Sequence, residues 1–283
     1  MRAPIPILPS IAALAATSDA WIVDIWGVMH NGAHAHPAAG AACRAFRARG
    51  GTVVLLSNAP RPFANVIPHM TSLGVDPAAY DAGVTSGDAT REMIAAWQGR
   101  RLFHIGPDRD KPLFEGYDVE LSAPEAADVI ICSGLWDDSR ETPADYKDLF
   151  TGLLARNVPM ICANPDILVE RGHEIIYCAG ALAADYEARG GKVTYAGKPH
   201  APIYERTLRE IAKIRGGAVP MEKILCIGDG LETDLLGAHR AGLRSVFIAS
   251  PIFVPQGLDA GVLTKLFGDR PFAPEAALEA LAW

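Results

Sequence analysis

The chain has 283 residues, of which 49% are hydrophobic and 21% charged, and its formal net charge is −7. This length favours one large domain or two moderate ones, and the apolar fraction is sufficient for a well-filled core. The acidic balance argues against a nucleic-acid partner, which requires a basic surface, and the apolar runs are too short to predict a membrane span.

The cysteines indicate a reducing compartment. They number five, an odd count, and no two form a CxxC pair: Cys43, Cys132, Cys162, Cys178 and Cys226. A thiolate metal site is therefore disfavoured. Three of them lie in or beside apolar runs, where cysteine is usually a small buried hydrophobe. We expect a cytoplasmic protein without disulfides.

The first 20 residues allow two interpretations. Arg2, an apolar stretch and small residues are features of a signal peptide. Prolines at positions 4, 6 and 9 interrupt that stretch, however, and an apolar strand-like run follows at once. A short lead-in helix capped by Ser10 is the favoured interpretation.

Short apolar runs recur along the chain and alternate with helix-forming stretches. The runs are WIVD (21–24), TVVLLSN (52–58), DVIICSG (128–134), VPMICANPD (158–166), KILCIGD (223–229) and SVFIAS (245–250). Residues 38–50 and 201–214 have the composition and period of helices. Continuous aliphatic runs suit strands that are buried on both faces. The alternation predicts an α/β fold with a parallel sheet.

The middle of the chain has its own strands and helices and could be an inserted domain. We predict a core formed by residues 1–82 and 186–283, and a smaller α/β domain at residues 83–185. The core would then close around the insertion.

Polar residues follow several of the predicted strands. Asp24 ends the first run, Ser57 and Asn58 end the second, and Asp229 follows a later one. In parallel sheets ligands bind beyond the carboxyl ends of the strands, so these residues are the first candidates for a site. Asp24 could be a nucleophile, a metal ligand or a turn residue. Ser57 and Asn58 could bind an anion through hydroxyl and backbone N–H groups, or could cap a helix.

Two further segments complete the pattern. Lys198, in the GKP segment, supplies a positive charge unless it is merely solvated. Asp229, Glu232 and Asp234 form an acidic cluster that suits Mg²⁺, although an acidic helix start would look the same. Each signal is weak alone. Together, an acidic nucleophile, a small hydroxyl, a lysine and an acidic pair predict a phosphoryl-transfer site.

On these residues the chain resembles the haloacid dehalogenase superfamily. The four motifs are DIWGVMHNG (24–32), LLSNAP (55–60), AGKPH (196–200) and IGDGLETDLLGAHRAGLRS (227–245). The segments VTSGDAT and ICANPD are similar to the subfamily IIA branch, which contains nitrophenyl-phosphatase-like and phosphoglycolate-phosphatase-like enzymes with a large α/β cap. The resemblance implies a Rossmann-like core, an inserted cap domain and a Mg²⁺-dependent phosphatase that forms an aspartyl-phosphate on Asp24.

The resemblance also assigns ligands and exposes one departure. It implies that Mg²⁺ is held by Asp24, the backbone carbonyl of Trp26, Asp229 and Asp234, and that Ser57, Asn58 and Lys198 bind phosphate. Phosphatases of the family carry a second Asp, a general acid and base, where this chain has Trp26. An indole N–H donates a hydrogen bond but does not titrate usefully.

Three hypotheses follow from Trp26. The first, which we favour, is a phosphatase that has another acid or whose leaving groups need none; His30 is the nearest titratable replacement, followed by His34 and His36. The second is a catalytically impaired protein that binds and senses a phosphorylated metabolite. The third is a structural role in which Trp26 fills the site.

Substrate selection is expected in the inserted domain. Asn164 and Asp166 resemble the family's cap loop, and Arg171 and His173 could meet an anionic or polar substrate, although each could also be an ordinary solvated residue. The expected substrate is a small phosphorylated metabolite, and a homodimer is an expectation from the resemblance alone.

Overall fold

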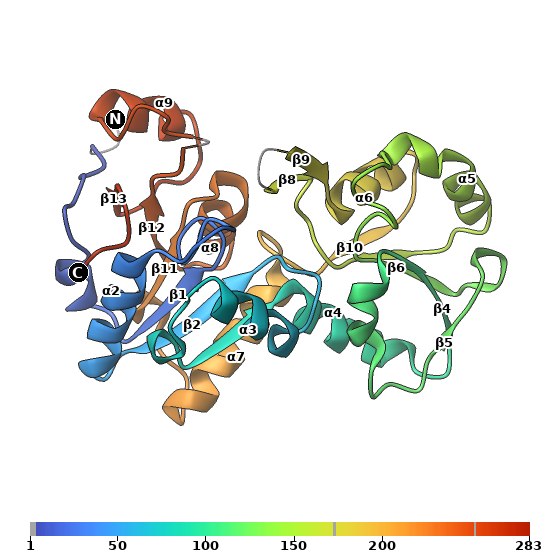
Figure 1. Cartoon of the computed structure of the whole chain (residues 1–283), viewed down its shortest axis with the longest axis horizontal. Coiled ribbons are helices and arrows are strands. Elements are labelled where there is room, and N and C mark those ends of the chain that lie inside the picture. The colour runs from blue at the N-terminus through green and yellow to red at the C-terminus, as the bar shows by residue number, and fades with distance from the viewer. Residues whose placement is uncertain (1–3, 172–173, 252) are drawn as a thin grey trace. The chain divides into compact units, whose positions relative to one another are not determined.

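The computed structural model describes residues 4–171, 174–251 and 253–283, and this part of the chain divides into two compact units (Figure 1). The described residues of Met1–Ser57, Ile67–Val84 and Tyr204–Trp283 form the first unit. Asn58–Val66 and Thr85–Ile203 form the second. The predicted boundaries of core and inserted domain stay a prediction.

The first unit is built on a six-stranded sheet with the strand order β13-β12-β11-β1-β2-β3. The strands are β1 Ala20–Asp24, β2 Thr52–Ser57, β3 Ala82–Thr85, β11 Ile224–Gly228, β12 Arg244–Ile248 and β13 Ala276–Leu278. β1 pairs in parallel with both β2 and β11, and β12 pairs in parallel with β11 and β13. All five residues of β1 and of β11 are buried, which explains their continuous apolar sequences.

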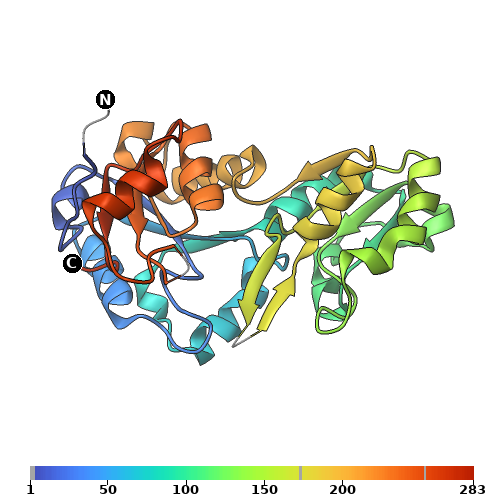
Figure 2. The same cartoon turned by 90° about the horizontal axis from the view of Figure 1, so that it is seen from above.

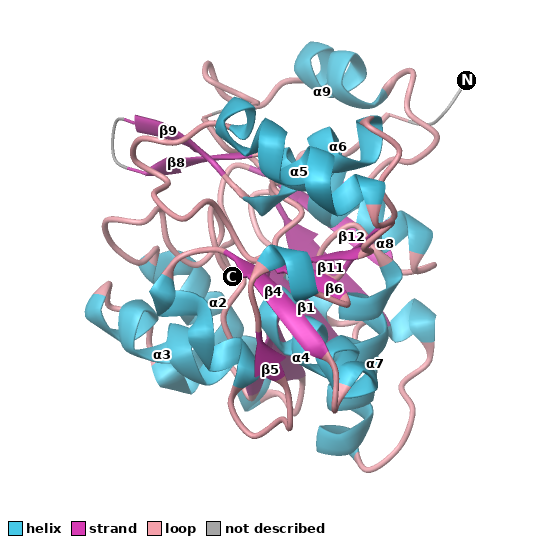
Figure 3. Ribbon diagram, turned by 90° about the vertical axis from the view of Figure 1, so that its right-hand side faces the viewer, coloured by secondary structure: helices cyan, strands magenta, loops and turns pink. Residues whose placement is uncertain are grey.

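Helices cover both faces of this sheet. They are α1 Ala12–Ala15, α2 Pro37–Ala48, α3 Phe63–Ser72, α7 Ala201–Arg215, α8 Leu236–Arg240 and α9 Ala260–Phe267. Figure 3 shows α2 and α3 on one side and α7 and α8 on the other. Pro37 is the first residue of α2, a position at which a backbone N–H has no partner within the helix, so that its missing N–H breaks no hydrogen bond. Phe46 of the same helix stacks on Trp21 of β1 at 3.9 Å between ring centroids.

The second unit has a five-stranded parallel sheet in the order β10-β7-β6-β4-β5. Its strands are β4 Arg101–Ile105, β5 Glu120–Leu121, β6 Val129–Cys132, β7 Met160–Cys162 and β10 Val193–Tyr195. Its helices are α4 Ser86–Ile94, α5 Lys147–Ala155 and α6 Ala179–Ala188. A separate antiparallel ribbon of β8 Leu168–Arg171 and β9 Glu174–Tyr177 is yellow in Figure 2.

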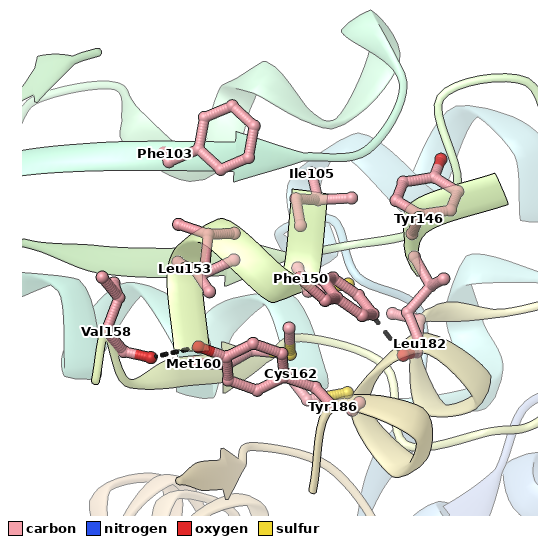
Figure 4. Packing of buried hydrophobic residues seen from close by; sticks show 14 of the residues in the cluster. Phe103, Ile105, Tyr146, Phe150, Leu153, Val158, Met160, Cys162, Leu182 and Tyr186 are labelled. Carbon is pink, nitrogen blue, oxygen red and sulfur yellow. Dashed lines mark hydrogen bonds between the residues drawn. The ribbon is translucent and has the colours of Figure 1, made fainter. Parts of the chain in front are cut away.

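Aromatic packing fills the core of the second unit. Phe150 of α5 is fully buried and lies 5.1 Å from Tyr186 of α6 and 6.0 Å from Tyr146, between ring centroids (Figure 4). The Tyr186 hydroxyl donates to the Val158 carbonyl at 2.7 Å, so its burial leaves no unpaired donor. This unit therefore has a hydrophobic core of its own.

Short 3₁₀ and π-helical segments connect many of these elements. They are the 3₁₀ segments Pro77–Ala79, Ala95–Trp97, Asp108–Phe114, Pro124–Ala126, Pro143–Tyr146 and Met221–Lys223, and a π-helical turn at Leu231–Leu235.

The predicted fold class is confirmed: the protein is α/β, with a parallel Rossmann-like sheet and a smaller α/β unit inserted in the chain. All six predicted strands form, as β1, β2, β6, β7, β11 and β12, and the two predicted helices are α2 and α7. The lead-in helix is α1, but its N-cap is Ile11, not the predicted Ser10; Ser10 Oγ, one residue earlier, accepts the Ala12 N–H at 3.1 Å. Within the described residues, the helices are all too short or too polar to cross a membrane.

Candidate active site

Strand register gathers the predicted residues of the first unit at one edge of its sheet. Asp24 is paired with Leu56, so Ser57 lies one residue beyond it on the neighbouring strand. On the other side Val23 is paired with Ile227, which brings Gly228 level with Asp24 and Asp229 just past it. The carboxyl ends of three adjacent parallel strands thus present Asp24, Ser57 and Asp229 together.

A cluster of three carboxylates results. Asp24, Asp229 and Asp234 each offer an oxygen, and these oxygens all lie within 4.8 Å of one another. Asp24 and Asp234 are buried, and Asp229 is partly exposed. Two unit charges at that separation repel by roughly 3 kcal/mol at an effective dielectric constant of about 20. Because carboxylate oxygens are the ligands that hard cations prefer, this donor set fits Mg²⁺.

Gly27 makes room for the cluster. Its φ angle is +90°, in the region that favours glycine, and a Cβ at this position would overlap the carboxylate of Asp229. The turn after β1 and the turn after β11 can therefore approach each other only with glycine at position 27.

A buried tyrosine that sequence reasoning missed supports Asp234. Asp234 lies in the π-helical turn after β11, and its Oδ2 accepts the Gly230 N–H at 3.2 Å. The Tyr204 hydroxyl of α7 donates towards the Asp234 carbonyl at 3.3 Å. Burial, followed by nearby acidic groups, raises the pKa of Tyr204 well above its usual range, so the hydroxyl stays a donor. Helical spacing alone marks Tyr204 only as a core position.

Trp26 packs against His30 and Gly32. Its side chain is 38% exposed, its ring meets His30 edge-on at 5.3 Å between centroids, and it covers Gly32. His30 is buried, and its Nδ1 accepts the Gly32 N–H at 3.1 Å. Burial, and then the positive charges of His69 and His36, lower the pKa of His30 to about 4. This shift favours the neutral imidazole at neutral pH, and a role of His30 as the acid stays a prediction.

The second unit brings together another predicted group. Lys198 and Asn58 are both buried, and they form two hydrogen bonds between the Asn58 side chain and the Lys198 backbone. Asn58 Nδ2 also donates to Asp166 Oδ1 at 2.8 Å. Asn164 Oδ1 in turn accepts the Asp166 N–H at 3.0 Å.

The remaining predicted residues fall outside these groups. Arg171 ends β8, but its side chain and the whole of His173 lie outside the described residues. Glu232 forms an ion pair with Arg270. The structure thus places Asp24, Ser57, Asp229 and Asp234 in one unit and Asn58, Lys198, Asn164 and Asp166 in the other. Convergence of the two groups around one ligand stays a prediction.

Comparison with known proteins assigns the family. Residues 21–120 match the model of the haloacid dehalogenase-like hydrolases, and residues 195–265 match a related HAD-hydrolase-like model. A haloacid dehalogenase-like hydrolase from Brucella suis 1330 is 45% identical and similar in structure, with a TM-score of 0.86 over 97% of this chain and 99% of that one. The chain belongs to the haloacid dehalogenase-like hydrolases, which confirms the resemblance seen in its motifs.

More distant relatives agree with the predicted subfamily IIA. The ribonucleotide monophosphatase NagD of Escherichia coli K12 is 24% identical over 84% of this chain and 90% of its own length. A 4-nitrophenylphosphatase from Thermotoga maritima is 23% identical, covers 94% of this chain and 96% of its own, and has the same fold, with a TM-score of 0.73.

Gly27→Ala tests the close approach at the carboxylate cluster. We expect a loss of stability larger than the approximately 1 kcal/mol that a left-handed backbone costs an alanine, together with weaker Mg²⁺ binding, because the new methyl group displaces Asp229. Urea unfolding and calorimetric titration with Mg²⁺ measure the two effects. Gly50→Ala is the matched control, since Gly50 has φ +84° and open space around it. Equal effects of the two substitutions would contradict the packing described for Gly27.

The buried His30 predicts an acid-sensitive stability. Its folded pKa of about 4 lies below the ordinary 6.5, so its contribution is complete above pH 6.5 and is lost as the pH falls towards 4. The loss should approach about 3 kcal/mol, since one pH unit of displacement corresponds to about 1.4 kcal/mol. His30→Asn keeps an acceptor for the Gly32 N–H and should flatten this part of the profile in urea unfolding. The buried environment would be refuted by parallel profiles for wild type and variant. His104, whose pKa is also lowered to about 4, remains in both proteins as a common background.

Proposed function

We propose that the protein is a Mg²⁺-dependent phosphatase that hydrolyses a small phosphorylated metabolite through an aspartyl-phosphate on Asp24. The observation that carries the proposal is the cluster of Asp24, Asp229 and Asp234, formed where adjacent strands end. Two relatives, named as a ribonucleotide monophosphatase and a 4-nitrophenylphosphatase, support phosphomonoester hydrolysis as the reaction.

In this proposal Asp24 is the nucleophile. One of its carboxylate oxygens attacks phosphorus as the bond to the leaving oxygen breaks, and the electron pair departs with that oxygen. The Ser57 hydroxyl, the Asn58 backbone N–H and the Lys198 ammonium hold the phosphoryl oxygens. Asp24, Asp229, Asp234 and the Trp26 carbonyl would hold Mg²⁺, which supplies positive charge against the repulsion between the nucleophile and the phosphate. Water then releases phosphate from Asp24.

Trp26 sets the expected rate. The Trp26 side chain can neither protonate the leaving group nor activate the water, and general acid–base catalysis is worth about 10²–10⁴ in rate. That factor corresponds to roughly 3–5 kcal/mol of barrier. Positioning and electrostatic stabilisation remain, so we propose a slow enzyme rather than an inactive one, best suited to substrates whose leaving groups depart without a proton.

The alternative function is a phospho-metabolite sensor on the same fold. The absence of an acid at position 26 and the neutral His30 favour it, because both reduce turnover without affecting phosphate binding. The retention of Asp24, Ser57, Lys198, Asp229 and Asp234 favours the enzyme, since binding alone does not require a nucleophile.

The second unit is the proposed cap and substrate-selecting domain. Asn164 and Asp166, in the loop after β7, together with Arg171 and His173, are the residues proposed to select the substrate. A cap that closes over the site would also exclude water from the aspartyl-phosphate and prolong its lifetime.

Hydrolysis of 4-nitrophenyl phosphate tests the proposed reaction. We expect phosphate release with Mg²⁺, none with EDTA, and at least a thousandfold loss in Asp24→Asn, because an amide cannot form the aspartyl-phosphate. Acid-quenched labelling with ³²P should trap phosphate on the wild type and not on the variant. Label on Asp24→Asn would refute the nucleophile assignment. Stabilisation by phosphate, in a thermal melt, without any turnover would favour the sensor.

Leaving-group dependence tests the missing acid. Aryl and acyl phosphates should be hydrolysed at least about 10²-fold faster than alkyl phosphates of matched affinity. Trp26→Asp should raise the rate on alkyl phosphates more than on aryl phosphates, since the new carboxyl group supplies the proton. Equal rates on both substrate classes in the wild type would mean that another group serves as the acid.

A further inference from the structure

The Asn58 side chain joins two segments that are far apart in the chain. Asn58 Oδ1 accepts the Lys198 N–H at 2.7 Å, Nδ2 donates to the Lys198 carbonyl at 3.2 Å, and Nδ2 also donates to Asp166 Oδ1 at 2.8 Å. We propose that the side chains of Asn58 and Asp166 are positioning groups that hold Lys198 in place without contacting the substrate, so that Asp166 influences substrate selection only through Lys198. This inference rests on the proposed function, in which Lys198 binds the phosphoryl group.

The amide of Asn58 is matched to both backbone groups of Lys198. Its oxygen and its nitrogen pair with the N–H and the carbonyl of the same residue, so the pair fixes the peptide groups on both sides of the Lys198 Cα. The direction of the Lys198 side chain is set by that Cα. A long lysine side chain loses much rotational freedom when it is buried, as Lys198 is, and a fixed starting point reduces the error in the position of its ammonium group.

Asp166 determines which way round the amide lies. A carboxylate only accepts hydrogen bonds, so the Asn58 nitrogen must face Asp166. A reversed amide would place its oxygen against both the Asp166 carboxylate and the Lys198 carbonyl, two repulsive contacts in a buried place. Asp166 therefore acts on Lys198 through Asn58.

Two hydrogen bonds of its backbone hold Asp166 in place. Its N–H donates to Asn164 Oδ1 at 3.0 Å, and its carbonyl accepts the Gly180 N–H at 3.1 Å, at the start of the ten-residue helix α6. Its carboxylate is thus a fixed reference point for the amide rather than a mobile surface charge.

Close packing around Gly197 confirms that these segments are fitted to each other. A Cβ at Gly197 would overlap Asn58 Oδ1 and would lie 2.7 Å from both Pro165 Cδ and Ser86 Oγ. The loop after β2, the start of α4 and the loop after β7 all meet this one glycine. A change in the proposed substrate-selecting loop can therefore alter Lys198 without touching a substrate.

Kinetics of matched variants test the positioning role with 4-nitrophenyl phosphate. Asn58→Ala should lower kcat by about 10²-fold and Asp166→Asn by about tenfold, with much smaller changes in KM, because misplacement of about 1 Å can cost that much. Asn58→Asp sets two carboxylates against each other. Adding Asp166→Asn to it restores a donor–acceptor pair and should recover at least about tenfold in kcat. Ser86→Ala is the control, since its hydroxyl has no hydrogen-bond partner among the described residues, and kcat should stay within about twofold.

Hydrogen exchange of the Lys198 amide separates this inference from the proposed function. Exchange should accelerate at least tenfold in Asn58→Ala and not in Ser86→Ala, whether or not the protein is an enzyme. A wild type that neither hydrolyses the ester nor binds inorganic phosphate would refute the proposed function. Unchanged exchange in Asn58→Ala would refute the positioning of Lys198 by the Asn58 side chain. If Asn58→Ala or Asp166→Asn raises KM at unchanged kcat, these side chains are ligands of the substrate and the positioning role is wrong.

Discussion

Mutual repulsion among three carboxylates is the constraint on which the site depends. Asp24, Asp229 and Asp234 bring their oxygens within 4.8 Å, with two of the three side chains buried. Such a cluster is unfavourable unless a cation neutralises it. Two features keep the carboxylates together: the glycine turn at Gly27 leaves room for Asp229, and the buried Tyr204 hydroxyl donates towards the Asp234 carbonyl. The parallel sheet makes the cluster possible, because the carboxyl ends of its adjacent strands lie at one edge.

The first-unit part of the site could be predicted from sequence because it follows from strand ends. An apolar run that ends at Asp24, Ser57 or Asp229 predicts both a strand and the polar residue at its end. Parallel pairing of these strands then places the polar residues at the same edge of the sheet. Short strands gave no such signal: Glu120–Leu121 has two residues, and Val193–Tyr195 has three and lies at a sheet edge. The roles of Tyr204 and of the Asn58 side chain could not be predicted from a local sequence pattern. The Tyr204 hydroxyl contacts a residue 30 positions away in the sequence, and the Asn58 amide contacts one 140 positions away.

Trp26 and His30 pack against each other after β1. The indole covers Gly32 and meets the edge of the buried His30 ring, whose lowered pKa favours the neutral imidazole at neutral pH. Our proposal assigns phosphoryl transfer to Asp24 as nucleophile, to the acidic cluster as the Mg²⁺ site and to Lys198 as a phosphate ligand. This combination agrees with phosphoryl transfer that relies on electrostatics and leaving-group chemistry more than on proton transfer.

A crystal structure of the protein with Mg²⁺ and beryllium trifluoride, a mimic of an acyl-bound phosphoryl group, tests the central claim most directly. We expect beryllium bonded to an Asp24 oxygen, Mg²⁺ on Asp24, Asp229 and the Trp26 carbonyl, and fluorines contacted by Ser57 and the Lys198 ammonium. Crystals in which both ions are absent from the carboxylate cluster at saturating concentrations, or in which Lys198 lies remote from Asp24, would contradict it.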